Sequence, residues 1–73
     1  MNRYSIILFP DPEEGGYTVT VPALPGCVTE GDTSEEAIEN AKDAIRLYLE
    51  DLAAQGETIP EEKAIPELST VEV

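Results

Sequence analysis

Two stretches near the start of the chain have the hydrophobic patterns of β-strands. Residues 3–9, RYSIILF, place Tyr4, Ile6 and Leu8 on one face and Ile7 and Phe9 on the other, which indicates an interior strand or one at an interface. Residues 17–21, YTVTV, alternate strictly between apolar and hydroxyl side chains, as a half-buried strand does. The sequence between them, PDPEEGG, is rich in proline and glycine, so residues 3–21 are predicted to form an antiparallel hairpin with a long acidic tip.

A short third strand is predicted over residues 27–30, and a long helix follows it. Thr33 is a good N-cap, and Glu36 three residues later completes a capping box. Apolar residues then recur at spacings of three and four, which predicts one apolar face. These residues are Ala37, Ile38, Ala41, Ile45, Tyr48, Leu49 and Leu52. Gly56 is a plausible stop for this helix of about twenty residues.

The rest of the chain is predicted to be a connector and a final strand. Residues 57–68 are polar and punctuated by proline, with Ile59 and Ile65 placed to pin them to the body. Residues 68–73, LSTVEV, alternate again and predict a last strand. The predicted fold class is α+β: a small, mostly antiparallel sheet with one long helix packed on one face, in the order β-β-β-α-β. Residues 1–73 suit a single domain.

The charge balance narrows the kinds of partner. Sixteen acidic residues face four basic ones, for a formal net charge of −12. Such a field repels phosphate backbones and anionic membranes, so direct binding of nucleic acid or membrane is not expected. A basic protein partner is favoured, although solubility alone is a simpler account of the charge. A single cysteine and an apolar N-terminal run of only four residues, 6–9, favour the cytoplasm over secretion.

Residues 21–31, VPALPGCVTEG, could be an active-site loop or a shaped connection. A nucleophilic Cys27 would need a histidine or a cation to lower its pKa, but the chain has no histidine, and Glu30 and Asp32 are nearby. We therefore expect Cys27 to be packed rather than reactive. The predicted structural motif of this loop consists of Pro22, Pro25, Gly26, Cys27 and Gly31.

Metal and cofactor chemistry finds little support in the sequence. A two-metal nuclease needs carboxylates that converge from strands and a helix, and residues 3–9 and 17–21 contain none. Calcium-loop spacing and the usual zinc ligands are also missing. We predict no cofactor and no metal site, and a protein that is not an enzyme. A metal-dependent nuclease stays open as a minor alternative that requires converging carboxylates.

Residues 16–62, from GYTVTVPALPGCVTEGDTSEEA to the exit GETIPEE, resemble the N-terminal domain of HicB-type antitoxins. The features that carry the resemblance are the GY-strand, the P-x-L-P-G-C turn, the T-x-G-D-[ST] helix entry, the alanine-rich acidic helix and the I-P exit. The resemblance covers about residues 3–65, most of the chain. One departure is Glu62, at a position where the family often has a second proline.

The resemblance implies a fold, a partner and a mechanism. The fold would be a partial ribonuclease-H-like one without the usual catalytic acids of that fold. The partner would be a HicA-type toxin, a small basic ribonuclease that cleaves mRNA, which the antitoxin neutralises by covering its basic active surface. Members of the family commonly self-associate, so a homo-oligomer (dimer or tetramer) is expected. The family's usual C-terminal DNA-binding module has no room after residue 65, so operator binding by this chain alone is not expected.

Charge and expected exposure select candidate toxin contacts. These are the acids of the hairpin tip and of the loop before the helix: Asp11, Glu13, Glu14, Glu30 and Asp32. The alternative function is an orphan oligomeric scaffold or regulatory domain that binds another protein or a small ligand at a subunit interface.

Overall fold

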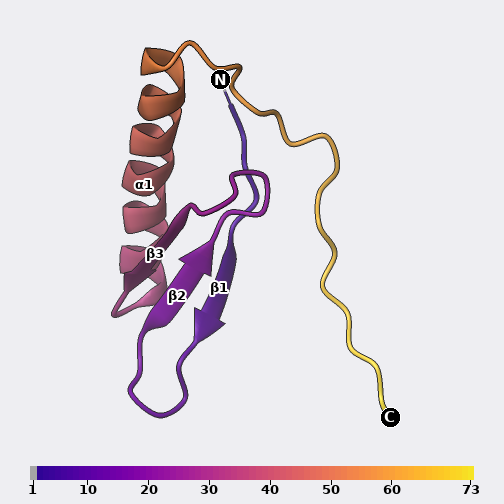
Figure 1. Cartoon of the computed structure of the whole chain (residues 1–73). Coiled ribbons are helices and arrows are strands. Elements are labelled where there is room, and N and C mark those ends of the chain that lie inside the picture. The colour runs from indigo at the N-terminus through magenta and orange to yellow at the C-terminus, as the bar shows by residue number, and fades with distance from the viewer. Residues whose placement is uncertain (1) are drawn as a thin grey trace.

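A three-stranded antiparallel sheet and one long helix make up the ordered body of the protein (Figure 1). The computed structural model describes residues 2–73, so the predicted domain start at Met1 lies outside the described part. The strands are β1 (Ile7–Pro10), β2 (Tyr17–Thr20) and β3 (Val28–Gly31), and the helix is α1 (Ser34–Ala54). The α+β class, the hairpin and the strand-to-helix order predicted from the sequence are confirmed. The first strand is shorter than predicted, since it begins at Ile7 rather than at residue 3, and it lies at the edge of the sheet. The likeness to ribonuclease H stays a prediction.

The strand register gives the sheet an inner face, which α1 covers. Leu8 lies opposite Val19, and Val19 lies opposite Thr29, so these side chains project from the same face. Val19 is completely buried against Ala37 and Ala41 of α1. The two alanines have no side chain beyond Cβ, so the helix axis can approach the sheet closely at this point.

A second cluster continues the core beyond the strand ends. Its buried members are Val21, Leu24 and Cys27, from the end of β2 and the loop that follows it. Half-buried side chains from the N-terminal segment and from α1 close over them, namely Tyr4, Ile6, Ala44, Ile45, Tyr48 and Leu49. Leu24 is fully buried, so the proline-rich loop is anchored by an apolar side chain.

Thr33 and Gly56 mark the two ends of α1 as the sequence predicts, but the bond expected from Glu36 to the N-cap amide is made one residue earlier. The Thr33 side chain accepts a hydrogen bond from the Glu36 amide at 3.1 Å. The Glu36 carboxylate accepts from the Asp32 amide, one residue before the position that a standard capping box uses. Gly56 takes a positive φ of 73° just past the helix, and its amide donates to the Ala53 carbonyl. Among residues 2–73, no helix combines the length and apolarity that crossing a membrane requires.

One residue of the predicted apolar face of α1 is misplaced. Ile38 is 41% exposed, whereas Ala44, which was not predicted, packs into the second cluster. Ala37 and Ala41 occupy the centre of the contact. Ile38 is rotated about 100° round the helix from Ala37, so its side chain turns towards solvent.

The predicted strand over residues 68–73 is wrong, because these residues form no strand. Leu68 is 96% exposed and Val71 is 86% exposed. Alternation makes a segment suitable for a strand, but a strand also needs a neighbour for its backbone groups. The segment runs past β1 and away from the sheet (Figure 1), and none of residues 68–73 makes a backbone hydrogen bond in the described structure.

The connector is held to the body by polar contacts rather than by the two isoleucines. The side chain of Ile65 is 75% exposed and that of Ile59 is 36% exposed, so the prediction that both pin the connector is wrong. The Tyr4 hydroxyl donates to the Pro60 carbonyl. The Glu62 carboxylate accepts from both the amide and the hydroxyl of Ser5, at 2.8 and 2.7 Å.

Candidate functional site

The two loops that carry the predicted contact acids meet at one end of the sheet. Tyr17 pairs with Pro10 on one side and with Gly31 on the other, so the β1–β2 loop and the loop before α1 lie next to each other. A Cβ atom on Gly16 would stand only 3.0 Å from the Gly31 carbonyl oxygen. The close approach of the two backbones joins two acidic segments that are fifteen or more residues apart in the sequence.

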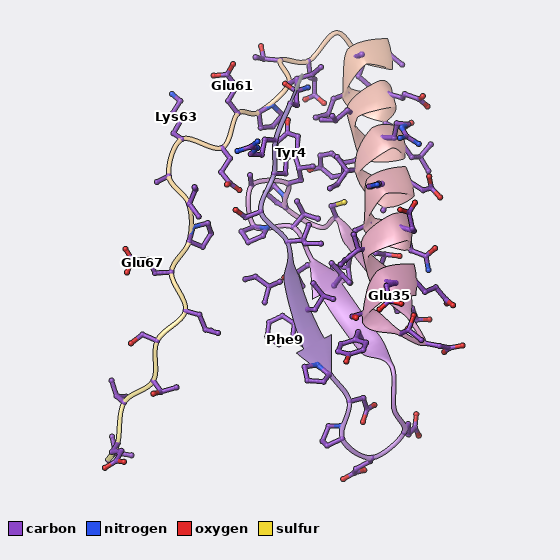
Figure 2. The ribbon with its side chains drawn as sticks, turned by 180° about the vertical axis from the view of Figure 1, so that it is seen from behind. Tyr4, Phe9, Glu35, Glu61, Lys63 and Glu67 are labelled. Carbon is purple, nitrogen blue, oxygen red and sulfur yellow. The ribbon has the colours of Figure 1, made fainter. Side chains whose placement is uncertain are left out.

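Seven exposed carboxylates gather at this end, which we call the acidic end. Five are the predicted contact residues, and the first turn of α1 adds two more. The seven are Asp11, Glu13, Glu14, Glu30, Asp32, Glu35 and Glu36. Figure 2 shows Glu35 at the lower end of the helix, next to the strand ends. Acids are favoured in a first helical turn because the helix dipole is positive there.

The β1–β2 loop has a defined shape that begins at Asp11. One oxygen of its carboxylate accepts hydrogen bonds from the Glu13 and Glu14 amides at 3.0 and 3.1 Å. Its own backbone amide and carbonyl bond to Gly16 and Gly15, both of which have a positive φ near 80°. The loop is therefore a closed turn rather than a loose tip.

Those hydrogen bonds also favour the ionised form of Asp11. The Glu14 amide, followed by the Glu13 amide, lowers the pKa of this carboxyl, since both bonds favour the ionised form. A carboxyl whose pKa is lowered by folding stabilises the loop at every pH above the ordinary pKa of aspartate. This contribution disappears as the pH falls through the lowered pKa. Asp11 therefore stays ionised to a lower pH than an ordinary aspartate, and two backbone amides of the loop are bound to that carboxylate.

Glu30 and Asp32 are also held in place by their backbones. Glu30 pairs with Thr18 in the sheet, and its carbonyl accepts from the Asn40 side chain at 2.7 Å. The Asp32 amide is bound by Glu36. Both side chains remain exposed, so their charges project outwards from a fixed frame.

The basic residues lie elsewhere. Lys42 pairs with Glu39 at 3.2 Å and Arg46 with Asp43 at 3.3 Å, farther along α1. Lys63 lies at the other end of the molecule (Figure 2), and Arg3 lines a hollow with Tyr4 and Glu62. Within residues 2–73, no carboxylate of the acidic end is in a salt bridge.

The carboxylates do not converge on one point. Among residues 2–73, no group of three or more aspartate, glutamate, cysteine or histidine side chains has the geometry to hold a metal ion. The converging carboxylates that a metal-dependent nuclease requires are thus not found in the described part. The arrangement can attract and orient a cationic surface, and it offers no nucleophile or general base in a protected cavity.

The loop motif acts as a rigid connection. The Val21 and Cys27 backbones bond across it, and the Leu24 backbone bonds to both. Gly26 has a φ of 82°, and the Tyr48 hydroxyl of α1 donates to the Pro25 carbonyl at 2.8 Å. Pro22 lies at the exposed start of the turn.

Cys27 and Gly31 are both closely packed, Cys27 in the second cluster and Gly31 between β3 and α1. Cys27 is only 6% exposed, and burial raises the pKa of its thiol, which is opposite to what a nucleophile needs. A Cβ on Gly31 would stand 2.5 Å from the Ala37 amide nitrogen, so only glycine fits between β3 and α1 without displacing them.

Two groups of residues were missed from the sequence. Glu36 was predicted only as part of the capping box and Glu35 was not chosen as a contact residue, although the position of Asp32 directly before the N-cap could have placed both at the same end. Glu62 was noted only as a departure from the family pattern, yet it binds Ser5. No local signal pairs residues 57 positions apart.

The comparisons with known proteins show the family to which the chain is similar. Residues 4–72 match the family model described as HicB_like antitoxin of bacterial toxin-antitoxin system. The chain is 50% identical over 62 residues to a UPF0150 protein of Thermoplasma acidophilum, which covers 85% of this chain and 88% of that protein. It is 47% identical to Antitoxin HicB 1 of Photorhabdus laumondii and 41% identical to Antitoxin HicB of Escherichia coli, each over 80% of this chain.

The lengths of these relatives differ. The chain spans 66% of a UPF0150 protein of Synechocystis, but only 37% and 41% of the two proteins named as antitoxins. The family description and those names point to a non-enzymatic regulatory protein, as the sequence predicts. Since the family model matches almost the whole chain, the protein belongs to the HicB-like antitoxin family of bacterial toxin–antitoxin systems.

Proposed function

We propose that this protein neutralises a HicA-type mRNA-cleaving ribonuclease by laying its acidic end over the basic surface of that enzyme. The observation that carries the proposal is the gathering of seven exposed carboxylates at one end of the sheet, none of which is in a salt bridge with any of residues 2–73. Family membership supplies the toxin–antitoxin context. The identity of the toxin rests on the resemblance to HicB antitoxins.

The way a ribonuclease binds RNA explains why an acidic surface would inhibit it. A ribonuclease binds a phosphate backbone, so its working surface needs clustered lysine and arginine. Carboxylates on a protein compete for the same cations, and complementary charge speeds encounter. The acidic end presents anions in a non-cleavable form and also blocks access to the active site.

The hydrogen bonds that hold the backbones of the two loops in place support tight binding. Asp11 closes the first loop through two backbone amides, and the second is fixed by the Asn40–Glu30 and Glu36–Asp32 hydrogen bonds. A surface whose backbone is already ordered loses less conformational entropy on binding. Long-range attraction is therefore combined with a preformed contact.

The partner is identified by a pull-down from the native cell with tagged protein, analysed by mass spectrometry at low and at high salt. We expect one small basic protein, lost as the salt concentration rises. Recovery of the protein alone at both salt concentrations would end the toxin-blocking proposal for this chain.

The surface is tested with charge-matched variants against the recovered basic protein. The first carries Asp11→Asn, Glu13→Gln, Glu14→Gln, Glu30→Gln and Asp32→Asn. Asparagine at position 11 can still accept the two amide bonds, so the loop should keep its shape. The control neutralises five acids away from the acidic end, Glu50, Asp51, Glu57, Glu61 and Glu67.

The first variant should weaken binding by about a hundredfold and flatten its salt dependence. The control should change affinity by about tenfold or less, because those acids act only through long-range attraction. Equal losses in the two variants would mean that net charge alone drives binding, and the acidic end would lose its special role.

Location and assembly complete the proposal. We place the protein in the cytoplasm, where mRNA is cleaved, as a homo-oligomer (dimer or tetramer) that binds neither membrane nor nucleic acid directly. The net charge of −12 opposes both of those surfaces. Self-association is supported by apolar side chains that the described monomer leaves exposed, among them Phe9 and Val28.

A further inference from the structure

The sheet has an apolar outer face that α1 does not cover. The register aligns Ile7 with Thr20 and Thr20 with Val28, on the side opposite the core. Phe9 lies on this side too, 52% exposed, and Val28 is 56% exposed. Large apolar side chains on two of the three strands make this face a candidate interface.

One edge of the same sheet is open and unprotected. β1 and β3 are the two outer strands in the order β1-β2-β3, and of the two only β1, with the sequence ILFP, contains no charged residue. Natural proteins protect open edges with charges, bulges or a covering segment, because unpaired backbone groups recruit other strands. Only Pro10, at the end of β1, works against pairing.

The chain itself carries an unpaired segment with strand chemistry. In residues 68–73 the side chains of Val71 and Val73 would share one face of a strand, and both are almost fully exposed, at 86% or more. The start of this segment faces the β1 edge across a hollow, which Leu68 and the two residues before it line together with Ser5, Ile6 and Ile7. The C-terminal end of the chain runs apart from β1 (Figure 1).

The chain is more extended than a compact domain of its length, and its C-terminal stretch lies apart from the sheet and the helix (Figure 1). The radius of gyration is 13.8 Å, whereas a compact chain of this length should have about 11 Å. Among residues 2–73, the large side chains that are fully buried are those of Val19 and Leu24 alone. A body this small gains much from additional apolar burial.

We propose that residues 68–73 pair with the β1 edge of a second copy, and that the second copy returns its own segment to the first. Six residues in a strand span about 20 Å, which is enough to cover β1 and the residue or two before it. In such a reciprocal exchange the same contact occurs twice, so the result is a closed dimer with two-fold symmetry. The proposal deepens the self-association in the proposed function and does not depend on toxin binding.

A second copy fits better than the chain's own segment folded back. A strand added to β1 within one chain would cover that edge, but it would leave Val28 on β3 exposed at the other side of the sheet. A second copy brings its body as well as its strand, and so covers the outer face. Glu62 bound to Ser5 directs the segment past β1 and outwards.

The first test compares solution mass for the whole chain and for two matched variants. The wild type should have twice the monomer mass by light scattering. Val71→Ser with Val73→Ser should weaken dimerisation by about tenfold or more, because it removes the apolar face. Thr70→Ala with Glu72→Ala alters the opposite face of the segment and should have a much smaller effect. All four side chains are exposed in the monomer, so each variant should fold.

The second test identifies which copy receives the segment. p-Benzoylphenylalanine replaces Thr70 in unlabelled protein, which is mixed with an excess of ¹⁵N-labelled wild type, unfolded and refolded together, and irradiated. We expect the cross-linked peptide to contain residues 5–10 and to carry ¹⁵N. The same photoprobe in place of Gln55, at the end of α1, should not reach that peptide.

Each other outcome overturns a distinct part of the proposal. A monomer at every concentration would remove self-association itself. A dimer that cross-links to unlabelled residues 5–10 would mean that the segment pairs with its own chain. A dimer that cross-links elsewhere, or is unaffected by the valine substitutions, would keep self-association but place it on another surface. None of these results bears on whether the acidic end binds a toxin.

Discussion

Gly31 is the residue at which the sheet and the helix come closest. A methyl group there would lie 2.5 and 2.7 Å from the Ala37 nitrogen and Cα atoms, both of which belong to backbone that cannot move alone. Gly31→Ala should therefore lower the free energy of unfolding by about 1–3 kcal/mol, measured by urea unfolding. Gly15→Asn is the control for open space, because its Cβ meets nothing within 4 Å. Its positive φ strains a side chain, but asparagine tolerates that conformation well, so its loss should be the smaller one. Similar losses in both variants would contradict the close-packing account.

Cys27 is a test of whether the proline-rich loop is a structural or a reactive element. Its pKa is raised by burial, so at neutral pH the thiolate population falls below that of a free cysteine. Labelling by a thiol reagent should be slow in native protein, increase as the pH approaches the raised value, and become fast in denaturant. Fast labelling of the folded protein at pH 7 would contradict the packed role.

At the scale of elements, β2 and α1 were predicted correctly because their signals lie within the sequence of each element. The strand over residues 68–73 was predicted wrongly because its formation depends on a distant neighbour. β2 follows from strict alternation and α1 from its cap, its apolar spacing and Gly56, all of which act within a few residues. The failed strand over residues 68–73 has the right alternation, yet whether it forms depends on an edge that only tertiary structure or a second copy supplies. Ile38 was misplaced because apolar spacing leaves the angular centre of the helix contact undetermined.

The connector is a second element that the sequence could not place, and Glu62 is the residue that places it. Glu62→Ala should free the connector from Ser5 and lower stability by about 1 kcal/mol. Hydrogen exchange of the Ser5 amide should accelerate, since its acceptor is gone. Glu61→Ala is the control, because Glu61 neighbours it in sequence and is exposed. A Ser5 amide equally protected in both variants would contradict the contact.

Tyr4 holds the same connector and makes that attachment sensitive to alkaline pH. Burial first, and then the negative charge of Glu61, raise the pKa of Tyr4 above its ordinary value, so folding favours the protonated form that donates to Pro60. This stabilisation is complete below the ordinary pKa of tyrosine and is lost as the pH rises through the raised value. The wild type and Tyr4→Phe should therefore differ in stability at neutral pH and converge in strong alkali. A gap that widened instead would contradict the hydrogen bond.

At the scale of the whole molecule, composition predicted the kind of surface but not its location. The net charge of −12 indicated a basic partner, and five of the acidic residues were chosen by loop position. What brings them together is the pairing of Tyr17 with both Pro10 and Gly31, a long-range register that composition does not encode. The same register adds the first turn of α1 to the acidic end.

The two proposed associations should respond to salt in opposite directions. Toxin binding joins opposite charges, so screening weakens it, whereas self-association brings together two copies that each carry a charge of −12, so screening relieves their repulsion. Between about 50 and 500 mM salt, the dissociation constant for the basic partner should rise while that of the dimer falls. A dimer that weakened with salt would need ion pairs across its interface, and the apolar exchange of residues 68–73 does not provide them. Partner binding insensitive to salt would mean that the acidic end is not the contact, even if the partner is the right one. Because the two titrations use the same protein and buffers, each serves as the control for the other.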